Sequence, residues 1–238
     1  MCSPEATVAE DLGAVLGAVA RTLQAEPDLD TTLTAIVTAA LNQVTGTDYA
    51  GISLIERGKI RTVAPTDEVV TAIDEIQYRT KQGPCVDAIV THEIYRTGDL
   101  TAETRWPAFT PAAAATGMRS MLAYRLFVSD TTLGSLNLYS RSLDAFSDQT
   151  ERDGQLFASH AAIALTGAQT EARLQVALGH RDAIGMAKGI LMERHDIDPV
   201  SAFQMLVESS QTTNMKLYQV AAWLVENRRE LSPRGSTG

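Results

Sequence analysis

Residues 181–217 read RDAIGMAKGILMERHDIDPVSAFQMLVESSQTTNMKL and decide the fold of the C-terminal part of the chain. Apolar and small side chains recur there at helical spacing, and polar residues interrupt them twice. Asp198 followed by Pro199 is typical of a helix start, because Asp caps free N–H groups and Pro suits the first turn. We therefore predict one helix over 174–195, a second from Pro199, and a third that begins near Asn214.

Each of these predicted helices carries its apolar positions on one face, and short connections join them. This pattern favours a compact all-α bundle of three helices. The predicted core positions of the second and third helices are Ala202, Phe203, Leu206, Val207, Leu217, Val220, Ala221, Leu224 and Val225.

Upstream of the bundle, the helical pattern extends back to about Ser147, which is long for a globular helix. Leu156, Ile163, Thr170 and Ala177 fall seven residues apart, although half of this series is weakly apolar. Two interpretations remain open. Either one continuous helix connects two domains, or one helix covers the first domain and a separate one starts the next.

The first 150 residues alternate between helical and strand-like periods, which predicts an α+β domain on an antiparallel sheet. Arg57-Gly58 and Ser129-Asp130 each separate two β-rich runs, so both are predicted hairpin turns. Helices are expected over 6–24, 30–45, 66–80 and 84–91 and from Pro107, and strands over 49–56, 59–64, 94–97, 118–128 and 131–140.

The composition is that of a globular protein, with 45% hydrophobic and 21% charged residues in 238. A net charge of −9 argues against attachment to a membrane surface and against non-specific nucleic-acid binding by the whole surface. Two cysteines, Cys2 and Cys85, form no disulfide framework, and the N-terminus lacks a signal-peptide pattern. We expect a cytoplasmic protein with no membrane contact and a disordered tail over 231–238.

The order of residues across the bundle resembles that of ANTAR domains, the RNA-binding modules of bacterial transcription antiterminators. The resemblance covers about 174–230, with one departure at Met215, where many members carry a basic or polar residue. It is carried by Ala187, Lys188, Gly189, Ile190, Leu191, Met192, Ala202, Phe203, Leu206, Ser210, Asn214, Lys216, Leu217, Val220 and Ala221. It implies a homodimer that binds tandem RNA hairpins through their loops and prevents transcription termination.

The resemblance to an RNA-binding module gives the basic, small and polar residues of this region candidate roles. Lys188 is expected to be exposed and to contact phosphate, and Lys216 to lie in a helix first turn that attracts phosphate. Gly185 and Gly189 allow either close approach of RNA or close helix packing. The predicted loop 209–214 either bonds bases or caps helices. The candidate RNA-binding residues are Arg181, Gly185, Lys188, Gly189, Arg194, Ser209, Ser210, Thr213, Asn214 and Lys216.

The formal charge of residues 174–230 limits how such a module holds RNA. Six basic and seven acidic side chains give a net charge of about −1. Counterion release at a few basic residues therefore supplies only part of the affinity. The rest is expected from shape, from splayed loop bases and from the avidity of a dimer. Phe203 has base stacking as its alternative role, but core packing is preferred.

The N-terminal part is similar to the GAF domains that precede ANTAR domains in actinobacteria, over about 25–165. The matching motifs are Gln82-Gly83-Pro84-Cys85 with Asp87-Ala88, Asp99-Leu100, Arg105-Trp106-Pro107, Gly117-Met118-Arg119-Ser120 and Gly134-Ser135-Leu136-Asn137-Leu138-Tyr139. The similarity implies a GAF-like sensor domain, a connecting helix over 166–180, and a pocket between the sheet and its helices for a small-molecule or redox signal. Candidate pocket residues are Cys85, Ile89, Trp106, Phe109, Met121, Tyr124 and Asn137, for most of which core packing is the alternative.

Cys85 follows Gly83-Pro84 and is expected near a helix N-terminus, a location that lowers the pKa of a thiol. A redox-sensing thiol with His92 on the same helix face is one interpretation, and a buried inert cysteine is the default. The four histidines show no metal-ligand spacing, and no phosphate loop, nucleophile elbow or zinc-protease motif is present. We expect no enzyme, metal or cofactor. The alternative function is a ligand- or redox-sensing dimeric protein-interaction module without RNA binding.

Overall fold

The structure is a computed structural model that describes residues 28–91 and 94–228. The predicted helix over 6–24, the tail over 231–238 and His92 lie outside the described residues. The chain divides into two compact units, an N-terminal unit that ends at Thr170 and a C-terminal unit that begins at Glu171.

The N-terminal unit is built on a five-stranded antiparallel sheet in the order β2-β1-β5-β4-β3. The strands are β1 (Tyr49–Glu56), β2 (Lys59–Val63), β3 (Tyr95–Thr97), β4 (Ser120–Val128) and β5 (Thr131–Ser140). Both predicted hairpins are present, with positive φ at Arg57, Gly58 and Ser129 in their turns. The predicted α+β class and antiparallel sheet are therefore confirmed.

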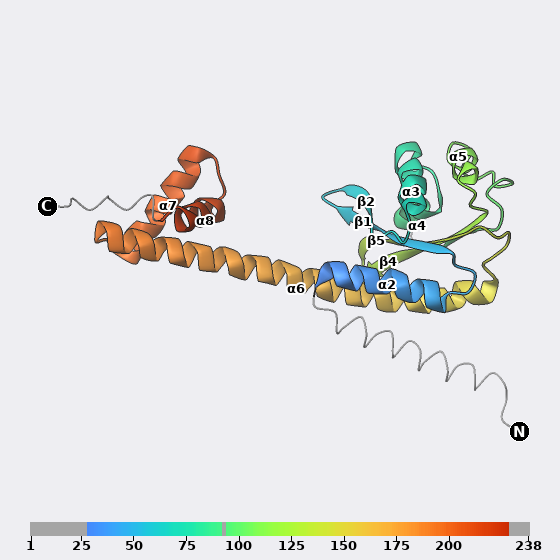
Figure 1. Ribbon diagram of the computed structural model, residues 1–238, viewed down its shortest axis with the longest axis horizontal. Helices are drawn as coiled ribbons and strands as arrows, with labels where there is room; N and C mark the ends of the chain where they lie inside the picture. The colour runs from blue at the N-terminus through green and yellow to red at the C-terminus, as the bar shows by residue number, and fades with distance from the viewer. Residues whose placement is uncertain (1–27, 92–93, 229–238) are drawn as a thin grey trace, which may run out of the picture. The chain divides into compact units, whose positions relative to one another are not determined.

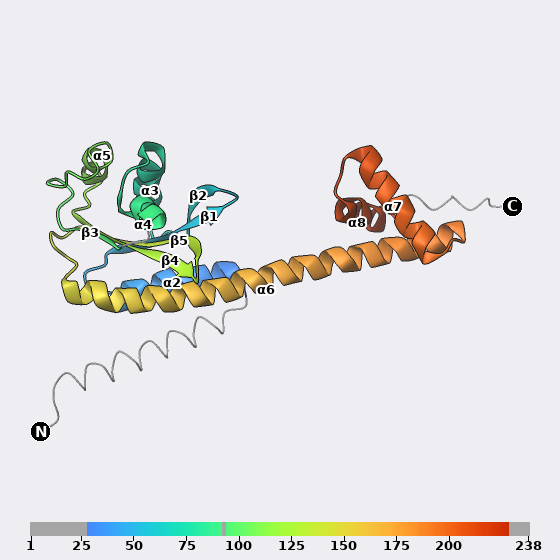
Figure 2. The same ribbon diagram turned by 180° about the vertical axis from the view of Figure 1, so that it is seen from behind.

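Helices cover both faces of this sheet (Figures 1 and 2). One face carries α2 (Leu29–Gln43) and the first part of α6 (Asp148–His195), and the other carries α3 (Glu68–Thr80), α4 (Pro84–Thr91) and α5 (Thr110–Ala115). Side chains alternate between the two faces along each strand. The α2 face buries the cluster that includes Ile52, Leu122, Tyr124 and Leu138, and the α3 face buries the cluster that includes Trp106, Phe109, Met121 and Tyr139.

The predicted helix start at Pro107 is wrong by three residues. α5 begins at Thr110 with Phe109 as its N-cap, and Pro111 occupies its first turn. The N–H groups of Phe109 and Thr110 both bond to the carbonyl of Trp106, which forms a separate turn before the helix.

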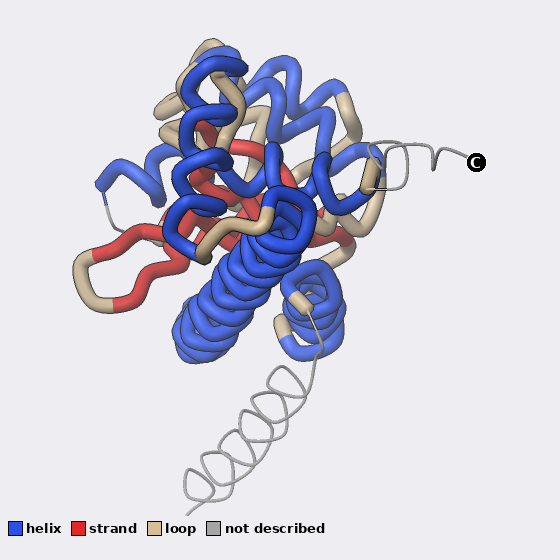
Figure 3. Tube along the Cα trace, turned by 90° about the vertical axis from the view of Figure 1, so that its left-hand side faces the viewer, coloured by secondary structure: helices blue, strands red, loops and turns tan. Residues whose placement is uncertain are grey.

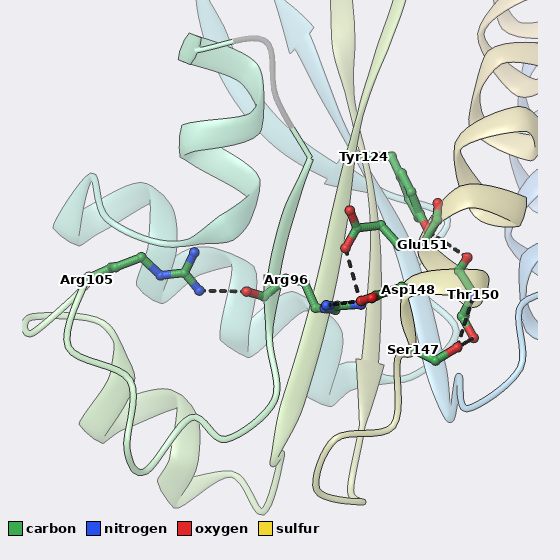
Figure 4. A network of polar contacts seen from close by, with 7 residues as sticks. All are labelled: Arg96, Arg105, Tyr124, Ser147, Asp148, Thr150 and Glu151. Carbon is green, nitrogen blue, oxygen red and sulfur yellow. Dashed lines mark hydrogen bonds and ion pairs between the residues drawn. The ribbon is translucent and has the colours of Figure 1, made fainter.

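α6 is one continuous helix of 48 residues that belongs to both units, so the interpretation as two separate helices is wrong. Its first turns are anchored to the sheet by polar contacts (Figure 4). Arg96 of β3 pairs with Asp148 at 2.6 Å and Glu151 at 3.4 Å. The hydroxyl of Tyr124 donates to the carbonyls of Thr150 and Glu151, each at 3.2 Å.

The C-terminal unit is helical and contains the end of α6, α7 (Pro199–Thr213) and α8 (Leu217–Glu226). Figure 3 shows the helices in blue and the strands in red from a third direction. The three helices bury a small core of Ala187, Leu191, Ala202, Leu206, Ala221 and Leu224. The predicted three-helix all-α region is confirmed.

The predicted start of the third helix at Asn214 is wrong. Asn214 ends α7 in the left-handed conformation, with φ 53°, and α8 begins at Leu217 with Lys216 as its N-cap. Asn suits both a helix start and a left-handed helix end, which explains the misassignment. As a result Ser209–Thr213 are helical, and the connection is residues 214–216 only.

Candidate functional site

Two hollows flank α7 in the C-terminal unit, and the predicted RNA-binding residues are divided between them. The first, here called the basic hollow, has a volume of about 620 Å³. It is lined by Arg181, Asp182, Ile184, Gly185, Met186 and Lys188 of α6 and by Phe203 of α7. Positions 181, 185 and 188 lie on one helix face, since they are separated by four and three residues.

The residues of the basic hollow combine positive charge with an accessible aromatic ring. Arg181 is exposed and Lys188 is half-buried, whereas Lys188 was expected to be exposed. Phe203 is 40% exposed, so its predicted core role is wrong. The adjacent Ala202 fills the core instead. This combination matches what phosphate and an unstacked base require.

Gly185 and Gly189 leave open space on the α6 surface. A Cβ built at either position would meet no heavy atom within 4 Å. Within the described residues, no other helix packs closely against these two glycines. The surface of α6 at these positions is open to a ligand.

The second hollow, here called the apolar groove, lies between α7 and α8 and has a volume of about 350 Å³. It is lined by Leu191, Met205, Leu206, Ser209, Thr213, Met215, Val220, Trp223 and Leu224. Trp223 is 52% exposed and Met215 is 42% exposed. Ser209 and Thr213 from the predicted set line this groove, and Asn214 and Lys216 are exposed in the adjoining connection.

The remaining predicted residues, Ser210 and Arg194, have structural contacts. The hydroxyl of Ser210 donates to the carbonyl of Met215 at 2.6 Å and so ties α7 to the connection that follows it. The guanidinium of Arg194 donates to the carbonyl of Arg228, after α8. Trp223 is absent from the predicted site residues. The sequence does contain a signal for it, because this tryptophan lies outside the predicted core stripe of its helix.

The interior of the N-terminal unit contains a buried polar cluster between the sheet and helices α3 and α4. Its members come from five elements and include two of the predicted pocket residues. They are Ser53, Thr62, Asp74, Gln77, Tyr78, Cys85, Ser135, Asn137 and Tyr139.

Asp74 lies at the centre of this polar cluster and is fully buried. Its carboxylate accepts hydrogen bonds from the hydroxyls of Thr62 and Tyr139 and from the side-chain amides of Gln77 and Asn137. Burial raises the pKa of Asp74 to about 6, because desolvation of the charge outweighs these hydrogen bonds.

Cys85 is fully buried in the same cluster, with its thiol 3.0 Å from the Ser53 hydroxyl and 3.1 Å from that of Ser135. Burial raises the pKa of Cys85 to about 12, and the nearby charge of Asp74 raises it further. The predicted lowering of its pKa by the helix N-terminus is therefore wrong, because desolvation dominates.

The other predicted pocket residues lie in three places. Trp106, Phe109 and Met121 are buried in the apolar cluster of the α3 face, and the indole N–H of Trp106 donates to Asp87 at 2.7 Å. Ile89 of α4 is 9% exposed. Tyr124 belongs to the opposite face of the sheet, so its assignment to a pocket with the others is wrong. Strand alternation separates it from Met121.

Two kinds of site are absent from residues 28–91 and 94–228. These residues contain no group of three or more His, Cys, Asp or Glu side chains placed to hold a metal ion. Within the same residues, no helix combines the length and apolarity that a membrane crossing requires.

Comparison with known proteins matches each of the two units to a domain family. The GAF domain model matches residues 26–166, more than half of the chain, and the ANTAR domain model matches residues 172–225. A search of curated proteins finds no match.

Solved structures share the fold of the N-terminal unit at low identity. The GAF domain of a phosphoenolpyruvate-protein phosphotransferase from Coxiella burnetii aligns with a TM-score of 0.53 and 15% identity, covering 69% of this chain and 98% of that one. The corresponding Acinetobacter domain has a TM-score of 0.51 and 13% identity, covering 66% and 93%.

A free methionine-R-sulfoxide reductase from Neisseria meningitidis, in complex with its substrate, is also similar. Its TM-score is 0.52 and its identity 15%, and the alignment covers 72% of this chain and 96% of that one. At such identities these likenesses establish the fold alone. The matched family models show that the chain belongs to the GAF domain family and carries an ANTAR domain after its GAF domain.

Proposed function

We propose that this chain is a signal-responsive RNA-binding regulator of the actinobacterial GAF–ANTAR type, which binds hairpin loops of nascent RNA in the cytoplasm and prevents transcription termination. ANTAR domains are RNA-binding antiterminators and GAF domains sense signals. The observation that carries the proposal is the basic hollow, where Arg181 and Lys188 lie beside the exposed ring of Phe203 and the open surface at Gly185.

The electrostatics of the C-terminal unit favour recognition by shape over recognition by charge. Arg181 and Lys188 line the basic hollow, and Lys216 lies in the connection between α7 and α8. Three phosphate contacts to a single-stranded loop give a slope of log K against log salt of about −2, at roughly −0.7 for each contact. A sequence-specific complex with so shallow a slope depends on base contacts for much of its affinity.

A homodimer paired along α6 is part of this proposal. Leu156, Ile163, Leu174 and Leu178 expose between 46% and 61% of their surface along this helix. Their spacing follows the a and d positions of a heptad, except that Leu178 lies one residue beyond the seven-residue series. Pairing of two helices along this stripe brings two C-terminal units to one RNA, and the second hairpin then binds at high effective concentration.

The test removes two cations from the C-terminal unit and keeps the fold. Tandem-hairpin RNAs with randomised loops are first enriched on the full chain. The Lys188→Ala, Lys216→Ala variant is expected to bind the enriched RNA at least tenfold more weakly, with its oligomeric state unchanged. The matched control is Lys59→Ala, Lys81→Ala, which alters charge equally in the N-terminal unit and is expected to bind normally.

The competing function is a dimeric sensing module that contacts proteins only, and the net charge of −9 is the observation that favours it. It predicts that the wild-type chain binds enriched and scrambled loops equally weakly. Equal affinity for both RNAs, or full affinity in the double variant, contradicts the RNA-binding proposal.

A further inference from the structure

We propose that the apolar groove between α7 and α8 receives one unpaired base of the RNA, with Trp223 as its stacking platform. The inference rests on the proposed RNA-binding function and adds a second contact, across α7 from the basic hollow. No residue of the predicted RNA-binding set supplies an aromatic ring to this groove.

Trp223 is placed for binding and not for the core of its own unit. On α8 the core positions are Ala221 and Leu224, and the indole between them is 52% exposed. An indole offers a large flat face, and stacking on such a face holds a base whatever its identity. The exposed indole therefore provides a surface in the groove on which a planar ring stacks.

The floor and walls of the groove are apolar. Leu206 and Leu224 are 2% and 8% exposed, so they form a closed floor. Met205 and Met215 line the groove, and methionine sulfur makes favourable contacts with aromatic rings. A volume of about 350 Å³ suits one flat ring system and its sugar, in the size range of small-ligand sites.

Polar groups also line the groove. Ser209 and Thr213 both line the groove, and the hydroxyl of Thr213 donates to the Ser209 carbonyl at 2.6 Å. That bond leaves the oxygen lone pairs of Thr213 free to accept from a base amino group. Asn214 is exposed immediately after them. Hydrogen bonds to base edges are how proteins select among unpaired bases.

The connection that borders the groove carries one cation, Lys216, and α7 and α8 each carry one exposed glutamate, Glu208 and Glu226. Between these two glutamates Lys216 is the single charged residue. Lys216 is exposed and caps α8, a ten-residue helix whose first N–H groups attract phosphate. The groove thus has an apolar slot for a base beside a positive site for its phosphate.

α7 contributes residues to both hollows. Phe203 lines the basic hollow, whereas Met205 and Ser209 line the groove. Residues 203 and 205 differ by about 200° around a helix axis, so they point to opposite flanks. A loop that crosses α7 would place one base against Phe203 and another against Trp223.

The test uses the two tryptophans of the full chain. Trp106 is 2% exposed in the N-terminal unit and serves as a constant background, while Trp223 is accessible. Titration with the enriched tandem-hairpin RNA is expected to quench the emission of Trp223. Trp223→Phe keeps an aromatic face and is expected to bind within about threefold of wild type, without quenching.

Trp223→Leu retains apolar bulk but removes the stacking face. Loss of one base–aromatic stack weakens binding by roughly 5- to 150-fold. The matched control is Phe127→Leu, at a ring that is 45% exposed in the N-terminal unit, and it is expected to leave affinity unchanged. Circular dichroism and thermal unfolding check that each variant is folded.

The outcomes separate this inference from the function on which it rests. Wild-type affinity in folded Trp223→Leu, with sequence-specific RNA binding intact, overturns the groove assignment alone. Absence of RNA binding by the wild-type chain overturns both proposals. If Trp223 emission instead changes with protein concentration and Trp223→Leu dissociates an oligomer, the groove is a contact between copies of the chain, and the base assignment is wrong.

Discussion

The buried carboxyl of Asp74 makes the stability of the N-terminal unit depend on pH. The pKa of Asp74 is raised from 3.8 to about 6 in the folded chain. Between these values the folded chain retains a proton that the unfolded chain has released, so the free energy of unfolding falls as pH rises from about 4 to about 6. The total decrease corresponds to about 3 kcal/mol.

Asp74→Asn is expected to remove this contribution. The difference in unfolding free energy between Asp74→Asn and wild type should therefore shift in favour of the variant by up to about 3 kcal/mol between pH 4 and pH 7. Burial raises the pKa of Tyr78, Cys85 and Tyr139, which face Asp74, so none of them titrates in this range. Urea unfolding followed by Trp106 emission, in a Trp223→Phe background, measures the difference. A difference that is constant with pH contradicts the assignment.

Cys85 is expected to be chemically inert in the folded chain. Its thiol has a pKa of about 12 and no solvent exposure, so its thiolate fraction at pH 8 is roughly a thousandfold below that of a free cysteine. In a Cys2→Ser background, a disulfide reagent should label Cys85 only after denaturant is added. Labelling of the native chain within seconds would instead support a redox-sensing role.

Side-chain roles were the least predictable part of the sequence. The polar cluster joins residues as far apart as Ser53 and Asn137, which are 84 positions apart, so no local pattern revealed it. Phe203 follows the core residue Ala202 in the chain. A rotation of about 100° around the helix separates the buried side chain of Ala202 from the exposed side chain of Phe203. Sequence spacing did place Arg181, Gly185 and Lys188 on one surface, because they share a helix.

At the scale of elements, the start of α6 depends on one glycine. A Cβ at Gly154 would lie 2.1 Å from the hydroxyl oxygen of Tyr124, whose side chain is 1% exposed. Displacement of that ring also breaks its bonds to the carbonyls of Thr150 and Glu151. Gly154→Ala is therefore expected to destabilise the N-terminal unit by about 1–2 kcal/mol, although alanine favours helix by about 1 kcal/mol.

The matched control for this substitution lies in the same helix. A Cβ at Gly167 meets no heavy atom within 4 Å, so Gly167→Ala should stabilise the unit by up to about 1 kcal/mol. Urea unfolding of both variants provides the comparison. Equal stabilisation by the two alanines would show that Tyr124 does not pack against Gly154.

The types and order of the described elements were predictable because periodicity is a local property. Periods of two and 3.6 residues separated strands from helices, and turn residues marked both hairpins. Helix ends were less predictable. Asn214 suits either end of a helix, and the choice between them depends on where Leu217 and Ala221 pack against the other two helices.

At the scale of the whole molecule, the exposed stripe of α6 predicts the oligomeric state. Ile163 is 61% exposed, so Ile163→Asp should leave the fold intact and place a charge in the proposed dimer seam. Sedimentation velocity is expected to show a dimer for wild type and a monomer for the variant. Val90→Asp, at a site 67% exposed on α4, is the control and should remain dimeric. A dimeric Ile163→Asp chain contradicts pairing along this stripe.

The strand order of the sheet also affects how the protein is made. β1 forms its second ladder with β5, whose residues 131–140 follow β1 by about 80 positions. At roughly 5–20 residues per second, a ribosome needs about 4–16 s to synthesise that interval. During this time the edge of β1 that β5 later covers has no strand beside it, and an unpaired edge invites association with other chains. A chaperone can therefore bind the nascent N-terminal unit during this interval, which ends when β5 leaves the ribosomal tunnel.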